Sequence, residues 1–188
     1  KVNTVYLQAF SDPDANGSAD MVYFPNRHLP MRADLFNRVS WQIQTRTQVK
    51  RVYAWMPLLA WDLPAKEPAS KDLVVTQQKQ DADHLNMGYH RLTPFSSRAR
   101  NTVREIYEDL AKSATFDGLL FHDDVTLSDY EDASPQALEQ YKKAGLPADL
   151  QKIRDNEALM EKWTGLKTRT LDNFAMELVG VVKQQQPY

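Results

Sequence analysis

Three short segments that are almost continuously apolar and rich in β-branched and aromatic residues constrain the fold of this chain more than any other feature. They are Val2–Phe10, Arg51–Met56 and Asp117–His122. A strand with one solvated face alternates apolar and polar residues, whereas a continuous apolar run is typical of a parallel strand covered on both faces. We therefore expect three parallel strands that are covered on both faces.

Helical patterns separate and follow these segments. Residues 31–48 and 98–114 carry apolar side chains at helical spacing. After the third strand we expect a short helix near 135–144 and a long one from about 150 to 184, with Asp149 as the N-cap of the long helix. This alternation of strands and helices predicts an α/β fold in which the helices cover a parallel sheet.

The number of strands decides between two α/β architectures. Three strands are few for a doubly wound sheet, and they fit better as about three consecutive βα units of an incomplete parallel (β/α) barrel of TIM type. The chain begins almost directly in a strand and ends just after a helix. We therefore expect residues 1–188 to be part of one barrel domain cut from a longer protein.

Composition excludes several classes of function. The sequence has 23 Lys and Arg against 25 Asp and Glu, so its net charge of −2 gives no general attraction to nucleic acid. Because there is no cysteine, disulfides, thiolate metal ligands and a cysteine nucleophile are excluded. The four histidines, His84 among them, lack the spacing of a zinc motif, so we expect neither a metal nor another cofactor. No apolar run reaches the roughly 18 residues that span a membrane.

Two neighbouring aspartates, Asp123 and Asp124, stand where the third strand ends. The carboxyl ends of parallel strands form the active-site face of barrels. Neighbouring side chains of an extended chain point to opposite faces, so one carboxylate can face a cleft while the other turns inward. Two such environments give two pKa values, as acid–base chemistry on sugars requires. The alternative is a pair of loop aspartates that cap main-chain amides.

Acidic residues continue beyond this pair. Between Asp117 and Tyr141 there are seven acidic residues and no Lys or Arg, a distribution that favours a cationic ligand. A solvated acidic loop or part of a calcium site are the alternatives. The segment DPDANGSAD at 12–20 faintly resembles a calcium loop but lacks the glutamate at the twelfth position, so a plain turn is favoured.

Aromatic residues surround the end of the second strand. Trp55 and Trp61 can stack on the apolar faces of sugar rings, and Asp62 is a suitable partner for sugar hydroxyls. Core packing is an equal alternative for Trp61, although we expect the turn at Pro57 to carry it toward the surface. Tyr89 and His90 lie together with Arg91 in the loop before the next helix, where a lone histidine is more often structural than catalytic.

Several blocks of this sequence resemble one family over nearly the whole chain and in the same order. The blocks are TVYLQAFSDPDANG, FPNRHLPMRADLFNRVSWQ, VYAWMPLLAWDL, YHRLTPF, FDGLLFHDD and LSDYEDAS. They resemble the C-terminal domain of the poly-β-1,6-N-acetyl-D-glucosamine N-deacetylases of the PgaB/HmsF type. The resemblance implies a (β/α) barrel with a long acidic groove that binds the partly deacetylated, partly cationic polymer. It also implies endo-glycosidase activity with acids of the FHDD block, here Asp123 and Asp124, as catalytic residues.

The resemblance also implies a set of groove residues that contact the polymer. These are Trp55, Trp61, Asp62, Tyr89, His90, His122 and Asp129. The deacetylase domain that precedes this region in the family is absent from residues 1–188. The family further implies a periplasmic location, outer-membrane association through the missing N-terminal parts, and an outer-membrane export porin as a possible partner. The alternative function is a non-catalytic module that presents the polymer to the deacetylase domain or to the export pore.

Overall fold

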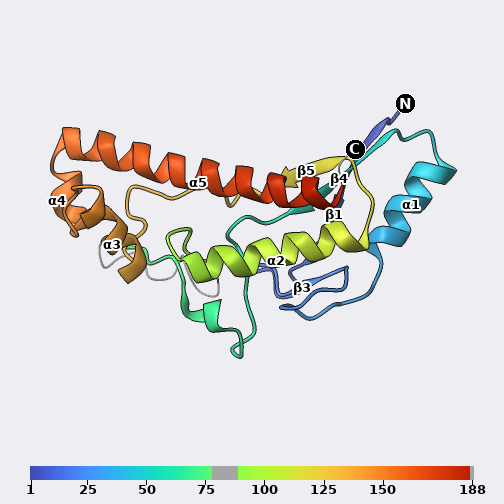
Figure 1. Cartoon of the computed structure of the whole chain (residues 1–188), viewed down its shortest axis with the longest axis horizontal. Coiled ribbons are helices and arrows are strands. Elements are labelled where there is room, and N and C mark those ends of the chain that lie inside the picture. The colour runs from blue at the N-terminus through green and yellow to red at the C-terminus, as the bar shows by residue number, and fades with distance from the viewer. Residues whose placement is uncertain (78–88, 187–188) are drawn as a thin grey trace.

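A three-stranded parallel sheet forms the centre of the computed structural model, which describes residues 1–77 and 89–186 (Figure 1). The strand order is β1 (Thr4–Gln8), β4 (Arg51–Met56), β5 (Gly118–Phe121). The three predicted strands and their parallel direction are thus confirmed, and their carboxyl ends lie at the same edge of the sheet.

A second, two-stranded antiparallel sheet follows β1 and was not predicted. It consists of β2 (Phe10–Ser11) and β3 (Met21–Val22). The predicted first strand divides at Ala9, whose N–H still donates to Trp55 O while its C=O already accepts from Tyr23 N. The chain therefore leaves β4 at this point and pairs with β3 instead.

Within residues 1–77 and 89–186, six helical segments accompany the strands. They are α1 (Phe36–Arg46), the 3-10 helix η1 (Pro68–Lys71), α2 (Ser97–Ser113), α3 (Pro135–Lys143), α4 (Leu150–Arg154) and α5 (Glu157–Gln185). The helices expected at 31–48, 98–114 and 135–144 are confirmed, the first beginning later than predicted. Within the described ranges, no helix is both long and apolar enough to cross a membrane.

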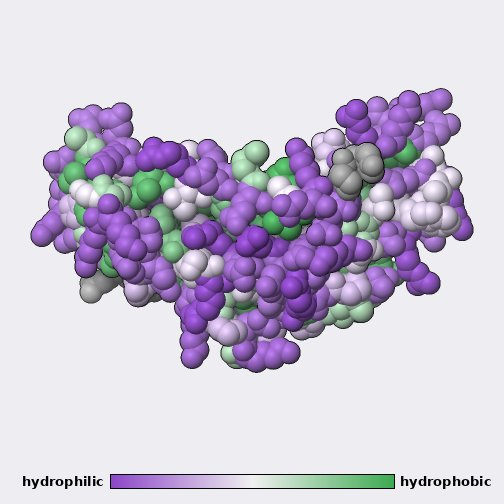
Figure 2. Space-filling model, viewed as in Figure 1, coloured by the Kyte–Doolittle hydropathy of each residue, from purple (hydrophilic) through white to green (hydrophobic). Residues whose placement is uncertain are grey.

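The long C-terminal helix predicted from about residue 150 is interrupted. It divides into α4 and α5 at Asp155, because the Asn156 side chain accepts from Leu159 N and caps a new helix. Gly165 and Gly180, in contrast, lie inside α5 without breaking it. Helix α5 runs alongside α2 (Figure 1), and the face that these two helices present is mostly hydrophilic (Figure 2).

The two faces of the central sheet differ. Val52, Ala54 and Met56 are fully buried, and Ala54 and Met56 join the apolar cluster that includes residues of α2 and α5. The alternate residue Trp55 is only partly buried, and Tyr6 is 57% exposed. The expectation that the strands are covered on both faces is therefore wrong for the described residues, because their helices pack on one face and leave the other open.

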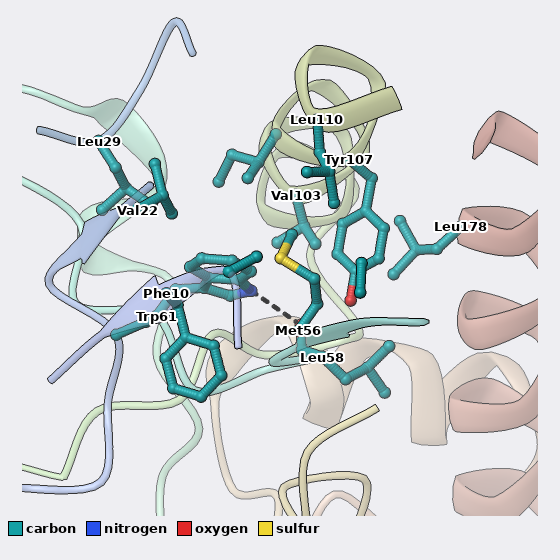
Figure 3. Close-up of a cluster of buried hydrophobic side chains, with 14 of the residues drawn as sticks. Phe10, Val22, Leu29, Met56, Leu58, Trp61, Val103, Tyr107, Leu110 and Leu178 are labelled. Carbon is teal, nitrogen blue, oxygen red and sulfur yellow. Dashed lines mark hydrogen bonds between the residues drawn. The ribbon is translucent and has the colours of Figure 1, made fainter. Parts of the chain in front are cut away.

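The main core lies between the sheet and helices α2 and α5. Figure 3 shows Met56 and Leu58 packed near Val103, Tyr107 and Leu110 of α2, with Leu178 of α5 close by. The Tyr107 hydroxyl donates to Pro57 O at 2.7 Å. The core therefore fixes the chain directly beyond the carboxyl end of β4.

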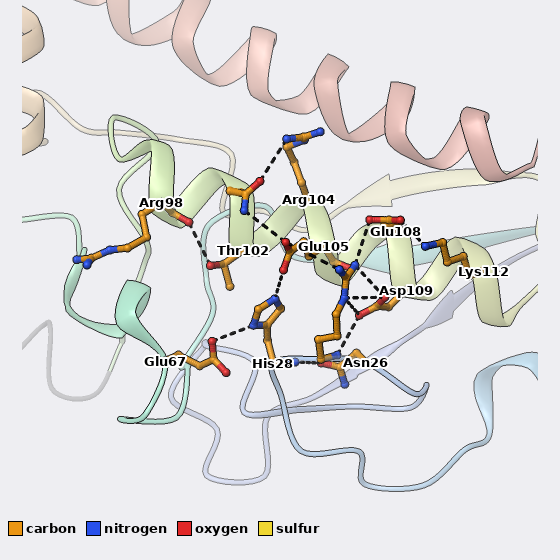
Figure 4. A network of polar contacts seen from close by, with 12 residues as sticks. Asn26, His28, Glu67, Arg98, Thr102, Arg104, Glu105, Glu108, Asp109 and Lys112 are labelled. Carbon is orange, nitrogen blue, oxygen red and sulfur yellow. Dashed lines mark hydrogen bonds and ion pairs between the residues drawn. The ribbon is translucent and has the colours of Figure 1, made fainter.

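The segment after β3 is attached to α2 by a polar network (Figure 4). His28 Nδ1 lies 2.8 Å from Glu67 Oε2, and His28 Nε2 lies 2.6 Å from Glu105 Oε2. Arg27 contacts Asp109 at 3.1 Å in the same network. Three segments that are far apart in the sequence are thereby held together: the loop after β3, the segment before η1 and helix α2.

Candidate active site

The carboxyl ends of β4 and β5 bring four of the nine predicted site residues to one edge of the sheet. His122, Asp123 and Asp124 follow β5 directly, and Trp55 is the penultimate residue of β4. Parallel pairing places Trp55 opposite Leu120, two residues before His122. Because side chains two residues apart in a strand share a face, Trp55 and His122 meet on the open face of the sheet.

Asp124 is fully buried, and its carboxylate binds main-chain amides. Its oxygens accept from the N–H groups of Leu58 at 2.9 Å, Leu59 at 2.7 Å and Ala60 at 2.6 Å. A carboxylate that accepts several main-chain N–H groups is held rigidly by these charge-assisted hydrogen bonds. Asp124 therefore attaches the turn after β4 to the end of β5.

Asp123 has the opposite environment. Its side chain is 92% exposed, and its Oδ1 lies 3.1 Å from His122 Nε2. The two aspartates thus show the alternation expected of neighbours at a strand end, with one carboxylate facing solvent and the other facing the interior. Of the pair, Asp123 is the carboxylate that a ligand can reach without a change in the structure.

His122 connects Asp123 to Trp55. The Trp55 indole Nε1–H donates to His122 Nδ1 at 3.2 Å, and the two ring centroids are 5.5 Å apart. Phe10 packs at the edge of both rings, with centroids 5.4 Å from His122 and 6.1 Å from Trp55. An aromatic cluster from three segments therefore supports the exposed carboxylate.

Trp61 lies in the core rather than at the surface. It is fully buried in the apolar cluster, and its Nε1–H donates to Leu58 O at 3.1 Å (Figure 3). The expectation that the turn at Pro57 carries Trp61 outward is wrong, because Asp124 binds the amides of residues 58–60 and turns the chain back into the core. In this arrangement Trp61 offers no face for a sugar ring.

Asp62 and His90 form a second polar pair. Asp62 Oδ1 lies 3.0 Å from His90 Nδ1, and the two side chains are 34% and 43% exposed. The Ser18 hydroxyl accepts from His90 N at 2.8 Å and donates to His90 O at 2.7 Å. The loop between β2 and β3 therefore positions a histidine that belongs to the segment before α2.

Tyr89 packs against the same loop. Gly17 has a φ of +95°, and a Cβ at this position would come 2.9 Å from Tyr89 Cδ2. Burial raises the pKa of the Tyr89 hydroxyl, and the negative charges of Asp124 and Asp123 act in the same direction, against the opposing effect of Arg91. Tyr89 is therefore a neutral hydroxyl near the aspartate pair.

Four of the seven acidic residues between 117 and 141 accept hydrogen bonds from segments that are distant in the sequence. They are Asp117, Asp124, Glu131 and Asp132. Asp117 accepts from Val52 N at 2.7 Å, and the buried Glu131 pairs with Arg91 and accepts from Thr76 Oγ1. Asp132 is fully buried and accepts from Val75 N. The exposed acids are Asp117, Asp123, Asp129 and Glu139, and Asp117 precedes β5 and binds Val52 N. The field that a cationic ligand meets at the carboxyl end of β5 is therefore smaller than the sequence suggests.

A buried lysine that the sequence did not single out fixes this acidic segment. Lys167 of α5 is 4% exposed, and its Nζ donates to Ser128 O at 2.7 Å and Glu131 O at 2.9 Å. The same Nζ lies 3.5 Å from the centroid of the Trp163 ring. Burial lowers the pKa of Lys167 to about 8. The segment that carries Asp129 is thus attached to α5.

Three carboxylates gather in the loop between β2 and β3. One oxygen each of Asp12, Asp14 and Asp20 lies within 4.8 Å of the others. Asp12 accepts from Gly17 N at 2.8 Å, as in a turn. Burial and the neighbouring carboxylates, Asp14 first, raise the pKa of Asp20 to about 6. Exposed acidic groups of this kind are common without a metal, so the expectation of a metal-free domain stays a prediction.

Comparison with known proteins places these features in a family. All residues from 1 to 188 match the family model described as hypothetical glycosyl hydrolase family 13, GHL13. The chain belongs to the GHL13 family. The GHL13 chain is 50% identical over 183 residues to the poly-β-1,6-N-acetyl-D-glucosamine N-deacetylases of Escherichia coli strains K12 and O157:H7. This match covers 97% of the chain but only 27% of those proteins.

Solved structures agree with the family assignment. The PgaB (BpsB) glycoside hydrolase domain from Bordetella bronchiseptica superposes with a TM-score of 0.91 at 49% identity, over 98% of the GHL13 chain and 52% of that structure. An α-L-fucosidase isoenzyme from Paenibacillus thiaminolyticus, at 14% identity and a TM-score of 0.64, shares the fold alone. The GHL13 chain is thus a glycoside hydrolase-like domain with a parallel α/β fold, and the resemblance found in the sequence is confirmed.

Proposed function

We propose that this domain binds and hydrolyses partly deacetylated poly-β-1,6-N-acetyl-D-glucosamine as an endo-glycosidase, with Asp123 as the general acid. The observation that carries the proposal is the contrast between two neighbouring carboxylates at the end of β5. Asp123 is exposed, whereas Asp124 has no exposed surface and binds three main-chain amides. The polymer is the one named in the related deacetylases, which share half of the aligned residues.

In this proposal Asp123 donates a proton to the glycosidic oxygen as the bond to the anomeric carbon breaks. Asp124 has a supporting role: it fixes the turn after β4. A mechanism with two protein carboxyls requires a second one about 5 to 5.5 Å or 6.5 to 9.5 Å away. Asp124, the neighbour of Asp123, is occupied by main-chain amides. We therefore propose that the N-acetyl group of the substrate itself attacks the anomeric carbon.

Recognition of the polymer is assigned to partly exposed side chains of β4, of the turn after it and of the segment before α2, together with exposed carboxylates. Trp55 and Tyr89 provide aromatic surface for sugar rings, and Asp62 and His90 provide polar partners for hydroxyl and amide groups. A deacetylated glucosamine unit carries an ammonium group, which favours exposed carboxylates such as Asp129. Trp61 is left out of this set because it is buried.

We further propose that the domain acts within a larger periplasmic protein that deacetylates and exports the polymer. The chain spans about a quarter of the length of the E. coli deacetylases that it matches. Association with the outer membrane, through parts that precede this region in the family, and contact with an export porin belong to this proposal. Fractionation of cells and co-purification with the porin test both points.

The test of the hydrolase function is Asp123→Asn in the full-length protein. We expect cleavage of partly deacetylated polymer to fall by about 100-fold or more, as for loss of a general acid, while binding persists. Product lengths measured by mass spectrometry report cleavage, and co-sedimentation with the polymer reports binding. Glu139→Gln, an exposed acid on α3, is the control and should cleave at the wild-type rate. If Asp123→Asn cleaves the polymer at the wild-type rate, Asp123 is not the general acid.

The alternative function is a binding module that presents the polymer without cutting it. The observation in its favour is that Asp123 is the only exposed member of the aspartate pair. A module of this kind would bind the polymer with normal affinity, yet the wild-type protein would leave its length unchanged. The same mass measurement therefore separates the two functions.

A further inference from the structure

The hydrogen bond between Trp55 and His122 determines which nitrogen of the imidazole carries the proton. An indole N–H is a donor only, and Trp55 Nε1 lies 3.2 Å from His122 Nδ1. Nδ1 must therefore accept, so the single proton of the neutral ring is on Nε2. His122 Nε2 in turn lies 3.1 Å from Asp123 Oδ1, a distance at which Nε2–H donates to the carboxylate.

The surroundings of the ring hold it in this orientation. A rotation of the imidazole by 180° would place carbons where the two nitrogens are now, and both polar contacts would be lost. Phe10 and Trp55 pack against the ring from neighbouring segments. The main-chain N–H of His122 donates to Met56 O at 2.9 Å, so the main chain at this point still follows the β4–β5 ladder. The histidine therefore stands on a rigid element.

We infer that Trp55 and His122 are positioning residues that hold the Asp123 carboxyl by its Oδ1 and leave Oδ2 for the proton transfer. This inference rests on the proposed function. In the step itself, the proton on Oδ2 moves to the glycosidic oxygen, and Asp123 becomes a carboxylate. The bond between that oxygen and the anomeric carbon breaks, and its electron pair goes to the oxygen. A hydrogen bond from Nε2–H is stronger to the ionised acceptor, so His122 stabilises Asp123 as the charge develops.

The substitution Trp55→Phe tests this inference because it removes the N–H donor and keeps an aromatic ring, which is smaller than the indole. Nitrogen-15 NMR of labelled histidine reports the tautomer independently of activity, and His122→Gln assigns the signal. We expect the wild type to show Nε2–H alone and Trp55→Phe to show a mixture of tautomers. We expect kcat on partly deacetylated polymer to fall about fivefold to tenfold, as for loss of one hydrogen bond, with KM changed by less than about twofold.

The control is Trp41→Phe, the same substitution at a tryptophan of α1 that is 56% exposed and remote from Asp123. It should change neither the NMR signal nor kcat. A wild-type signal from the Nδ1–H tautomer overturns the inference, and so does an unchanged kcat in Trp55→Phe when the wild type cleaves. If the wild type binds the polymer without cleaving it, the proposed function fails and the catalytic role of the two residues fails with it. The NMR signal then still decides whether Trp55 fixes the tautomer.

Discussion

The ring of Tyr53 lies directly over Gly118, its partner across the β4–β5 ladder. A Cβ on Gly118 would stand 2.6 Å from Tyr53 Cε1 and 2.8 Å from Cδ1. Glycine inside a strand usually marks such a close approach. The Tyr6 ring lies beside it, with its centroid 5.4 Å from that of Tyr53, so Gly118 leaves room for a pair of tyrosine rings on the open face of the sheet.

We predict that Gly118→Ala destabilises the protein by about 1 to 3 kcal/mol, because the added methyl group must displace the Tyr53 ring. Denaturant unfolding measures the change. Gly180→Ala is the matched control: a Cβ there meets nothing within 4 Å, and alanine in a helix interior is favoured over glycine by about 1 kcal/mol. Equal effects of the two substitutions would contradict the packing described for Tyr53.

The two aspartates should also differ in how much each contributes to the stability of the protein. Asp124→Asn is expected to lower the free energy of unfolding by about 2 to 3 kcal/mol, because an amide group replaces one of the acceptor oxygens beside three main-chain N–H groups. Asp123→Asn is expected to change it by less than about 0.5 kcal/mol, since its side chain is exposed. Thermal unfolding of the two variants checks this. A destabilised Asp123→Asn would mean that the contact between Asp123 and His122 stabilises the fold.

The buried Lys167 should give the protein a stability change at alkaline pH. Its pKa is lowered by burial to about 8 from 10.5, so between these two values the unfolded chain binds more protons than the folded one. The contribution of Lys167 to the free energy of unfolding therefore rises with pH between pH 8 and pH 10.5, by up to about 3 kcal/mol. Unfolding of wild type and Lys167→Met, compared at several pH values, isolates this contribution.

The matched control for that experiment is Lys162→Met, an exposed lysine on the same helix. It should keep the wild-type dependence on pH, whereas Lys167→Met should lose the rise between pH 8 and 10.5. If Lys167→Met and Lys162→Met give the same dependence, Lys167 is solvated rather than buried against the acidic segment.

His28 should matter more for stability than its neighbour Arg27. His28→Phe leaves the carboxylates of Glu67 and Glu105 without the imidazole that lies between them, and Glu67 is only 12% exposed. We expect a loss of about 1 to 3 kcal/mol. Arg27→Ala removes surface ion pairs of a side chain that is 47% exposed, and its loss should be under about 1 kcal/mol. Urea unfolding of both variants ranks them, and the reverse order would contradict the prediction.

Local patterns in the sequence predict the elements of this fold but not their distant contacts. The apolar segments predict β1, β4 and β5, and helical spacing predicts α2, because both signals are periodic over a few residues. The burial of Trp61 depends on Asp124, which lies 63 positions later and binds the preceding main chain. No local pattern carries that information, since it arises only when the two strand ends meet.

The candidate site shows the same limit. Adjacency of Asp123 and Asp124 at a strand end predicts two opposite environments, but the sequence does not tell which carboxylate faces inward. Glu131 and Asp132 look like part of an acidic surface in the sequence, yet they are buried through partners 39 to 57 residues away, Arg91 and Val75 among them. Counting charges therefore overestimates the acidic surface.

The bonds from Asp124 to residues 58–60 have a consequence for protein engineering. They make the turn after β4 and the end of β5 one mechanical unit, so neither segment moves without the other. A graft at residues 57–62 whose main chain no longer presents the N–H groups of positions 58–60 would release Asp124 and with it the neighbouring Asp123. To alter this edge of the sheet and preserve the position of the exposed carboxylate, both segments should be exchanged together. Asp124 should be kept, because it connects them.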